Sequence, residues 1–353
     1  MPKESDPAKN PERILIIGPA WVGDMVMAQA LFILLKRLNP QCVIDVLAPA
    51  WTNPLLARMP EVSNSFDMPI RHGQLRIGDR FTLGKQLRNT YEQAIVLPNS
   101  LKSALIPWFA NIPKRTGWRG EMRFGLLSDI RLLDKKRYPL MVERFLALGL
   151  PTAKQLPTDI KPQLIADEKR VPQLLVQFQL NQKKPVLVLC PGAEFGPAKQ
   201  WPSVHYAEVA KRKIAAGWQV WVMGSEKDMA VAKAINDELS IEERNNFCIL
   251  TGQTDLSQAI DLMSIADAVI SNDSGLMHIA AALHRPLVAV YGSTSPEFTP
   301  PLADRVSIES ITVDCGPCFQ RECPQGHLKC LVDLKPQQVL NGLENIIVSD
   351  HET

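Results

Sequence analysis

No apolar stretch in this sequence approaches the roughly 20 residues needed to cross a lipid bilayer, which excludes a membrane-spanning helix. The first twelve residues are polar and lack the apolar core of a signal peptide, so no secretion is implied. We expect residues 1–12 to form a disordered tail and the chain to be cytoplasmic. In that reducing compartment, the seven cysteines should be mostly thiols or metal ligands.

Three common ligand motifs are incomplete or missing. The turn Gly18-Pro19-Ala20-Trp21-Val22-Gly23 gives only part of the Gly-x-Gly-x-x-Gly fingerprint of dinucleotide-binding proteins. A P-loop would require Lys and Ser or Thr after Gly23, but Asp24 and Met25 follow it. No Asp-x-Asp pair marks a dedicated site for a divalent ion. The sequence therefore disfavours an NAD-dependent oxidoreductase and a P-loop enzyme.

Apolar strands alternate with helices through the first half of the chain. Short apolar runs bounded by turns predict buried strands at 13–18, 42–47, 94–97 and 115–117. Apolar residues at helical spacing predict helices at 24–38, 100–110 and 140–148. This order favours a parallel sheet covered on both faces.

The alternation restarts after a proline-rich segment, 151–172, which we interpret as a linker. Strands are predicted at 185–190, 219–223, 247–250, 268–270 and 287–291. Helices are predicted at 202–216, with Pro202 at the first helical position, and at 228–239, 256–265, 275–283 and 336–347. We expect an α/β protein with two doubly wound domains, 13–160 and 161–335, followed by a C-terminal helix and tail, 336–353.

The net charge of +2 hides an asymmetry between the halves. Residues 1–170 carry 25 Lys and Arg against 16 Asp and Glu, whereas residues 171–353 carry 14 against 21. Most of the excess lies in 71–137, which has 14 basic and 5 acidic residues. This stretch is either a solvated basic face or the binding region for an anionic partner such as a phosphorylated glycolipid, a membrane surface or a nucleic acid.

Polar turns follow four of the predicted strands, where ligands bind in open α/β sheets. In the first, Asp24 is either a helix cap or a general base that takes a proton from a hydroxyl. In the second, 190–202, small residues such as Gly192 allow a ligand close to the backbone, and Lys199 offers a charge for a diphosphate. In the third, 223–228, Glu226 stands where an acidic residue binds ribose hydroxyls.

The fourth turn, 271–278, joins a buried strand to a helix and contains a carboxylate, a hydroxyl, a glycine and an imidazole. These belong to Asp273, Ser274, Gly275 and His278. A strand-to-helix turn of this kind points free backbone N–H groups and a positive helix end at an anion, and a nucleoside diphosphate fits best.

Four cysteines lie within sixteen residues near the C-terminus: Cys315, Cys318, Cys323 and Cys330. The Cys-x₂-Cys half favours a zinc site. Such a site would be structural, because four thiolate ligands leave no open position on the metal for catalysis. An iron–sulfur site, labile disulfides and free thiols stay open as alternatives.

Three long motifs in this order resemble the lipopolysaccharide heptosyltransferases of glycosyltransferase family 9. They are Gly-Pro-Ala-Trp-Val-Gly-Asp at 18–24, Pro-Gly-Ala-Glu-Phe-Gly-Pro-Ala-Lys-x-Trp-Pro at 191–202, and Asn-Asp-Ser-Gly-Leu-Met-His at 272–278. Further stretches at 96–104, 115–123 and 298–301 are similar to the members that add the second heptose of the inner core. The resemblance covers about residues 13–348.

The resemblance implies a GT-B architecture, in which two Rossmann-like domains face each other across a cleft. The first would bind the acceptor, a Kdo₂-lipid A core bearing one heptose, and the second would bind ADP-L-glycero-D-manno-heptose. Heptose would be transferred with inversion at the anomeric carbon, at the inner face of the inner membrane, which the protein would contact peripherally. No nucleic acid partner is implied.

The resemblance also implies roles for individual residues. Asp24 would be the general base, and Lys199 would stabilise charge on the leaving ADP. Asp273 would bind the donor heptose, Glu226 the ribose, and Ser274, Gly275 and His278 the diphosphate. The acceptor would be bound by Asn99, Lys102, Arg119 and Arg123. No cofactor is required for the chemistry, although a divalent cation could assist.

Three rival functions remain on the sequence alone. Another GT-B glycosyltransferase would use a different nucleotide sugar or catalyse a different heptosyl transfer. An NAD-dependent oxidoreductase would need the glycine fingerprint that this chain has only in part. A non-catalytic module for anionic polymers would leave the ligand-type loops of the second half unexplained.

Overall fold

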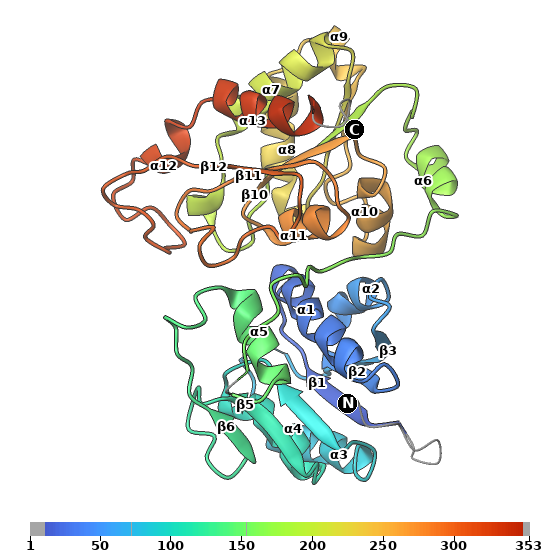
Figure 1. The fold of residues 1–353 in the computed structure, drawn as a ribbon. Coiled ribbons are helices and arrows are strands. Elements are labelled where there is room, and N and C mark those ends of the chain that lie inside the picture. The colour runs from blue at the N-terminus through green and yellow to red at the C-terminus, as the bar shows by residue number, and fades with distance from the viewer. Residues whose placement is uncertain (1–10, 72, 153, 349–353) are drawn as a thin grey trace. The chain divides into compact units, whose positions relative to one another are not determined.

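The computed structural model describes residues 11–71, 73–152 and 154–348. The first ten residues of the predicted disordered tail and residues 349–353 of the predicted C-terminal tail lie outside the described residues. The chain divides into two compact units, Met1–Ile160 and Lys161–Thr353 (Figure 1). Each is built on its own six-stranded sheet.

The first unit contains a parallel sheet in the order β3-β2-β1-β4-β5-β6. Its strands are β1 (Arg13–Ile17), β2 (Val43–Ala48), β3 (Val62–Asp67), β4 (Gln93–Val96), β5 (Lys114–Trp118) and β6 (Asp129–Arg131). Its helices are α1 (Val22–Leu38), α2 (Asn53–Leu56), α3 (Ile77–Gln86), α4 (Leu101–Phe109) and α5 (Met141–Gly149), with a 3₁₀ turn, η1 (Ala50–Thr52).

Both faces of the first sheet are buried, because successive strand residues point to opposite sides and both sets are apolar. On one side, Leu15, Ile17 and Val96 belong to a core cluster that α4 completes, with α3 packed against it. On the other side, α1 packs against α5, and Ile14 and Ile16 are buried. The two pairs of helices, α1–α5 and α3–α4, can be followed in Figure 1.

The second unit repeats the plan with the order β12-β11-β10-β7-β8-β9, again all parallel. Its strands are β7 (Val186–Cys190), β8 (Gln219–Val222), β9 (Phe247–Ile249), β10 (Ala268–Asn272), β11 (Leu287–Val290) and β12 (Val306–Glu309). Its helices are α6 (Val171–Gln177), α7 (Ser203–Ala215), α8 (Met229–Asp237), α9 (Ile241–Arg244), α10 (Leu256–Met263), α11 (Gly275–Ala282), α12 (Lys329–Val332) and α13 (Pro336–Val348), with 3₁₀ turns η2 (Pro197–Lys199) and η3 (Glu226–Asp228).

One core cluster of the second unit joins its sheet to α7, α8 and α13. Strand residues such as Leu187 and Ile270 pack there against Tyr206 and Leu343. The alternate strand residues, Val188 among them, are equally buried. A sheet apolar on both faces must be covered by helices on both sides, as the near-continuous Val, Ile and Leu runs predict.

In chain order, both sheets have the strand sequence 3-2-1-4-5-6 of a Rossmann-type fold. The prediction of two doubly wound parallel-sheet units is therefore confirmed. The strand order reverses between β1 and β4 in one unit and between β7 and β10 in the other. Ligands of such sheets bind at the carboxyl ends of the strands beside that reversal.

Three strands missed by sequence reasoning, β3, β6 and β12, lie at sheet edges. An edge strand is half exposed and needs no apolar run; in β3 every residue after the first is exposed. Pro202 is the N-cap of α7 and not its first helical residue, which corrects the prediction. Among the described residues, no helix is both long and apolar enough to span a bilayer.

Candidate functional site

Four polar loops lie at the carboxyl ends of four neighbouring strands of the second sheet. The loops follow β11, β10, β7 and β8, which are adjacent in that order. They bring Thr294, Asp273, Lys199 and Glu226 to one edge of the sheet. The sequence motifs at 190–202, 223–228 and 271–278 thus lie beside the strand reversal between β7 and β10.

Lys199 and Asp273 are in direct contact. The Lys199 Nζ donates to Asp273 Oδ2 at 2.6 Å, and both side chains are largely buried, with exposed fractions of 14% and 5%. Thr294 Oγ1 donates to the same Asp273 oxygen at 2.6 Å. Lys199 and Asp273 were both predicted as donor-site residues, and the structure places their side chains in contact, on loops that follow adjacent strands.

Asn272, the last residue of β10, holds the two loops in place. Its side-chain oxygen accepts hydrogen bonds from the Trp201 backbone N–H at 3.1 Å and from the Tyr206 hydroxyl at 3.0 Å. Its Nδ2 donates to the Pro191 carbonyl at 2.6 Å. The Asn272 side chain is fully buried. Because Pro191 and Trp201 lie before and after Lys199 in the chain, these hydrogen bonds fix the β7 loop against β10 on both sides of Lys199.

Helix α11 begins at Gly275, two residues after Asp273. Its N-cap, Ser274, makes no side-chain capping hydrogen bond, and Gly275 is the first helical residue. The first-turn N–H groups therefore have no partner from the cap side chain and point with the positive helix end toward the edge that Lys199 occupies. Such a helix start is suited to an anion.

His278 lies one turn into α11 and is buried. Burial is the main reason that its pKa falls to about 4; nearby Lys199 lowers it further, and Asp273 opposes the shift. The imidazole is therefore neutral at physiological pH. His278 can hydrogen-bond to a ligand but adds no positive charge for a diphosphate.

Glu226 is exposed in the loop after β8. At Gly192 the structure shows a second requirement for glycine, and the approach of a ligand to its backbone stays a prediction. A Cβ at Gly192 would lie 2.4 Å from the Asp228 carboxyl group. Asp228 in turn accepts from the Ser225 backbone N–H and hydroxyl, both at 2.8 Å. The glycine therefore allows the two loops to meet.

Sequence reasoning missed Arg321, which comes from the cysteine-rich segment 315–330. Its carbonyl accepts a hydrogen bond from the Ala198 N–H at 3.0 Å. Its guanidinium lies 5.5 Å from the centre of the Phe195 ring, over which Lys199 Nζ also lies, at 4.9 Å. Among the described residues, Arg321 has no acidic partner in the ion pairs of the structure. In the sequence, Arg321 is marked only as a basic residue within the segment whose cysteines were predicted to bind zinc.

Asp24 lies in the first turn of α1, in the loop region that follows β1. The cap of this helix is Trp21, so the alternative that Asp24 merely caps it is wrong. The residue is half buried. Helix α1 follows the carboxyl end of β1, the strand that neighbours β4. A negative charge in the first helical turn is favourable, because it faces the positive end of the helix.

Three predicted acceptor residues lie around the carboxyl ends of β4 and β5. Asn99 and Arg119 are exposed and Lys102 is half buried. The loops are joined by a hydrogen bond from the Glu121 N–H to the Asn99 carbonyl at 3.0 Å. The structure therefore places these three side chains where they could touch a ligand.

Arg123 does not share that placement, which corrects its predicted role. It is fully buried, and its guanidinium donates to the Pro98 carbonyl at 2.8 Å and to the Trp118 carbonyl. Burial lowers its pKa to about 10. Arg123 ties the loops after β4 and β5 together and has no access to an acceptor.

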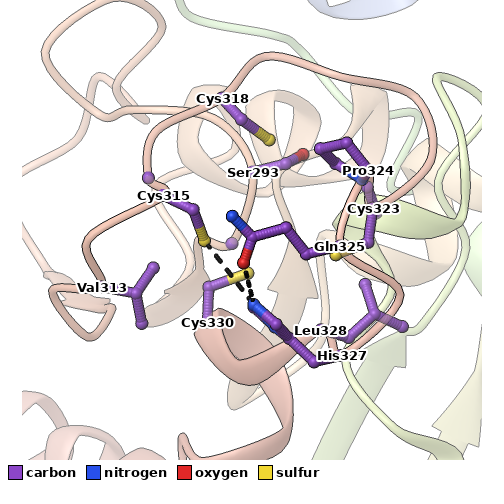
Figure 2. Close-up of a pocket in the computed structure, with 13 residues that line it drawn as sticks. Ser293, Val313, Cys315, Cys318, Cys323, Pro324, Gln325, His327, Leu328 and Cys330 are labelled. Atoms are coloured by element: carbon purple, nitrogen blue, oxygen red, sulfur yellow. Dashed lines mark hydrogen bonds between the residues drawn. The ribbon is translucent and has the colours of Figure 1, made fainter.

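The four clustered cysteines line a cavity together with Ser293 and His327 (Figure 2). All seven cysteines of the chain lie in its described part, and all are free. Hydrogen bonds from neighbouring backbone N–H groups, chiefly that of Leu328, lower the pKa of the Cys323 thiol. Because all of these cysteines are free, the structure contains no disulfide between them.

The cavity does not have the arrangement of a metal site. Figure 2 shows Cys318 set apart from Cys315, Cys330 and His327, with Gln325 pointing into the space between them. In the parts of the chain that the structure describes, no three His, Cys, Asp or Glu side chains could hold a metal ion. The residues as placed do not fit a tetrahedral zinc centre, and zinc here stays a prediction.

The chain matches the family model "Glycosyltransferase family 9 (heptosyltransferase)" over residues 80–329. It is 48% identical to "Lipopolysaccharide heptosyltransferase 2" of Escherichia coli (strain K12) over 345 residues, which are 96% of this chain and 99% of that protein. It is 47% identical to "Lipooligosaccharide heptosyltransferase 2" of Haemophilus influenzae, over 95% of this chain and 99% of the relative.

A solved structure shows the same fold at similar identity. It is described as the structure of Escherichia coli ADP-heptose LPS heptosyltransferase II. The TM-score is 0.87 and the identity 46%, with 96% of this chain and 99% of that chain covered. This chain therefore has the fold of that solved structure along almost its full length.

Proposed function

The chain belongs to glycosyltransferase family 9, the heptosyltransferases, and from this premise we propose the donor, the acceptor and the residues that its reaction uses. It is a GT-B glycosyltransferase that transfers heptose in lipopolysaccharide inner-core biosynthesis. The observation that carries the assignment of the site is the buried Lys199–Asp273 pair where the β7 and β10 loops meet.

The proposed donor is ADP-L-glycero-D-manno-heptose, held by the second unit. Its diphosphate lies at the start of α11, at Ser274 and Gly275, where backbone N–H groups and the helix dipole favour an anion. Lys199 balances the charge that grows on the leaving ADP. Asp273 accepts hydrogen bonds from heptose hydroxyls, and Glu226 accepts them from the ribose.

Neutral His278 contributes a hydrogen bond at most, and Arg321 adds the positive charge that His278 lacks. Lys199 is already paired with Asp273, so part of its charge is balanced before ADP binds. Arg321 shares the Phe195 ring with Lys199 and has no acidic partner among the described ion pairs. A diphosphate between them would be bound by two cations.

Asp24 is the proposed general base of the transfer. Its carboxylate takes the proton from a hydroxyl of the acceptor heptose, and that oxygen attacks the anomeric carbon of the donor. The bond from this carbon to the diphosphate oxygen breaks, ADP leaves with the electron pair, and the configuration inverts. One glycosidic bond replaces one glycosyl phosphate bond, so no redox partner is needed.

The proposed acceptor is Kdo₂-lipid A that bears one heptose, bound by the first unit. Asn99, Lys102 and Arg119 surround the carboxyl ends of β4 and β5, in a region with 14 basic and 5 acidic residues. The phosphates and carboxylates of that acceptor fit a basic surface. The enzyme is proposed to work in the cytoplasm at the inner face of the inner membrane.

No cofactor is proposed for the chemistry. Activity should survive chelation by EDTA, with at most partial loss if a divalent cation assists the departure of ADP. Elemental analysis of the purified protein decides the separate prediction of zinc at residues 315–330. No step of the proposed reaction uses a metal at these residues.

A transfer assay on two truncated acceptors tests the assignment. ADP-heptose is supplied with Kdo₂-lipid A that has no heptose or one heptose. Transfer to the second acceptor alone is expected, and transfer to the first alone would assign the chain to a different heptosyl step. Calorimetric titration with ADP, UDP and GDP is the companion measurement; a preference for UDP or GDP would indicate a GT-B enzyme with another donor.

A further inference from the structure

Helices α3 and α4 pack closely on one face of the first sheet. Gly84 of α3 allows this, because a Cβ there would lie 2.5 Å from the Phe109 Cβ and 2.9 Å from the Ile106 carbonyl oxygen of α4. The inner sides of both helices are buried with the sheet core. Their outer sides form a joint surface, here called the α3–α4 face. Among the described residues of the first unit, the strongest helix–helix packing is between α1 and α5 and between α3 and α4.

The α3–α4 face carries large apolar side chains in water. The Phe81 ring meets the Phe109 ring edge-on with 5.3 Å between centroids, and Trp108 lies 5.0 Å from Phe109. Phe81, Trp108 and Ile77 have exposed fractions of 44%, 42% and 53%, and Leu75, just before α3, has 47%. Exposed aromatic and aliphatic side chains that gather on one pair of helices are typical of an interaction surface.

Exposed basic residues accompany this apolar group. Residues 71–115 contain eight Lys and Arg but only two Asp and Glu. Arg80 is buried and donates to backbone carbonyls, whereas Arg76, Lys85 and Arg88 are exposed. Arg88 Nε donates to the Phe109 carbonyl at 3.1 Å, which fixes a positive charge beside the rings. Lys85 follows Ile77 and Phe81 at helical spacing and is exposed, and Asp79 is offset by Arg76.

We propose that the α3–α4 face docks on the surface of an anionic phospholipid bilayer. Tryptophan side chains such as Trp108 prefer the depth of the lipid head groups, because the ring is apolar while its N–H is polar. Basic side chains near an anionic membrane gain from the negative surface potential within about a Debye length. An apolar group accompanied by exposed basic residues is therefore complementary to this surface.

The proposal needs no catalysis and stands apart from the donor site. It agrees with a lipid-linked acceptor, because an enzyme docked on the membrane and its acceptor are both confined to the membrane surface and meet by diffusion along it. The α4 helix that presents Trp108 begins beside Lys102, one of the proposed acceptor residues. Docking through α3 and α4 would therefore keep the acceptor loops of the first unit near the lipid head groups.

Vesicle flotation of the full chain tests the proposal. The probe vesicles contain phosphatidylcholine alone or with phosphatidylglycerol. The wild-type chain should bind the mixed vesicles, and binding should weaken as salt is raised. The double variant Ile77→Ser, Trp108→Ser should bind the mixed vesicles with an affinity lowered about tenfold or more, because its apolar contacts with the lipid are removed. Lys85→Glu should lower binding to the mixed vesicles only.

The matched control is Ile241→Ser, which removes an equally large side chain that is 78% exposed in the second unit. It should bind vesicles like the wild type. Circular dichroism and thermal melts verify that each variant folds. Equal binding by the double variant, or no wild-type binding to mixed vesicles, overturns the proposal. A wild-type dimer that the double variant dissolves in sedimentation velocity would assign the face to a second copy.

Transfer to a lipid-free core oligosaccharide separates this proposal from the function. The double variant should keep the wild-type rate on that soluble acceptor and lose rate only on acceptor in vesicles. A wild-type chain that fails on both acceptors but floats with mixed vesicles would refute the transfer reaction and leave membrane docking intact.

Discussion

The Lys199 ammonium lies 2.6 Å from the Asp273 carboxylate, and Thr294 donates to that carboxylate from the next loop. The loops after three adjacent strands thus contribute one side chain each to a small polar cluster that is largely buried. A lysine held in this way does not need to be ordered when a ligand binds. Such fixed charges are effective where negative charge develops in a reaction.

Replacement of Lys199 by Ala should lower kcat by roughly 10²–10³-fold, the usual loss when one stabilising group is removed from a developing charge. ADP binding, measured by calorimetry, should also weaken. Lys227→Ala is the matched control, since Lys227 lies on a neighbouring loop in an exposed pair with Glu194. Equal effects of the two substitutions would contradict the role of Lys199.

Asp24→Asn tests the proposed base. Turnover should fall by about 10²–10⁴-fold, because the amide cannot take the proton from the acceptor hydroxyl. ADP binding should stay unchanged, since Asp24 belongs to the other unit. The thermal melt should shift little, because the lost helix-dipole interaction is worth about 0.3–1 kcal/mol. Normal turnover in a folded variant would remove Asp24 from the mechanism.

The central strands and the loops after them were predictable from sequence for a simple reason. Strands such as β7 and β10 are buried on both faces, so their residues read as short apolar runs. A polar turn after such a run marks the carboxyl edge of a parallel sheet, where ligands bind. Lys199 and Asp273 could therefore be assigned to one site before their contact was seen.

Other parts depend on contacts between distant residues and leave no local pattern. Arg123 resembles a basic acceptor residue in sequence, yet Pro98 and Trp118 carbonyls hold it inside the unit. Gly192 is needed for Asp228, thirty-six positions later in the chain. The polar edge strand β3 carries no apolar run. These features become visible only when the chain is folded.

Asn272→Ala should destabilise the second unit by about 2–4 kcal/mol. Loss of the amide leaves the Trp201 N–H, the Tyr206 hydroxyl and the Pro191 carbonyl without their partner in a buried place. Chemical denaturation measures the free energy of unfolding. Tyr206→Phe, which removes a single hydroxyl, should cost less; a neutral Asn272→Ala would show that water replaces the amide.

His278 should make the chain less stable in acid. Its pKa is lowered from the ordinary 6.5 to about 4 in the folded state, so between these values the unfolded chain binds more protons. Stability is then fully present above pH 6.5, decreases as the pH falls toward 4, and does not change further below it. The shift corresponds to about 3 kcal/mol at most.

His278→Asn should flatten that part of the pH profile, with unfolding followed at several pH values between 4 and 7. Burial drives the shift, and Lys199 and Asp273 are the charged groups that face the imidazole. Lys199→Ala should therefore reduce the slope slightly. A profile that is equally steep without His278 would show that other groups cause the acid sensitivity.

Arg321→Ala should weaken ADP binding more than it weakens folding. The hydrogen bond that joins the segment to the β7 loop uses the Arg321 carbonyl, which Ala retains, so Ala198 keeps its partner. Only the guanidinium over Phe195 is lost. We expect a several-fold to tenfold rise in the Kd of ADP, about 1 kcal/mol, and partial rescue by Lys. Arg244→Ala, an exposed arginine of α9, is the control. If the Arg321 and Arg244 variants bind ADP alike, the cysteine-rich segment supports the β7 loop through its backbone alone, and Lys199 is the only cation of the pair that acts on the diphosphate.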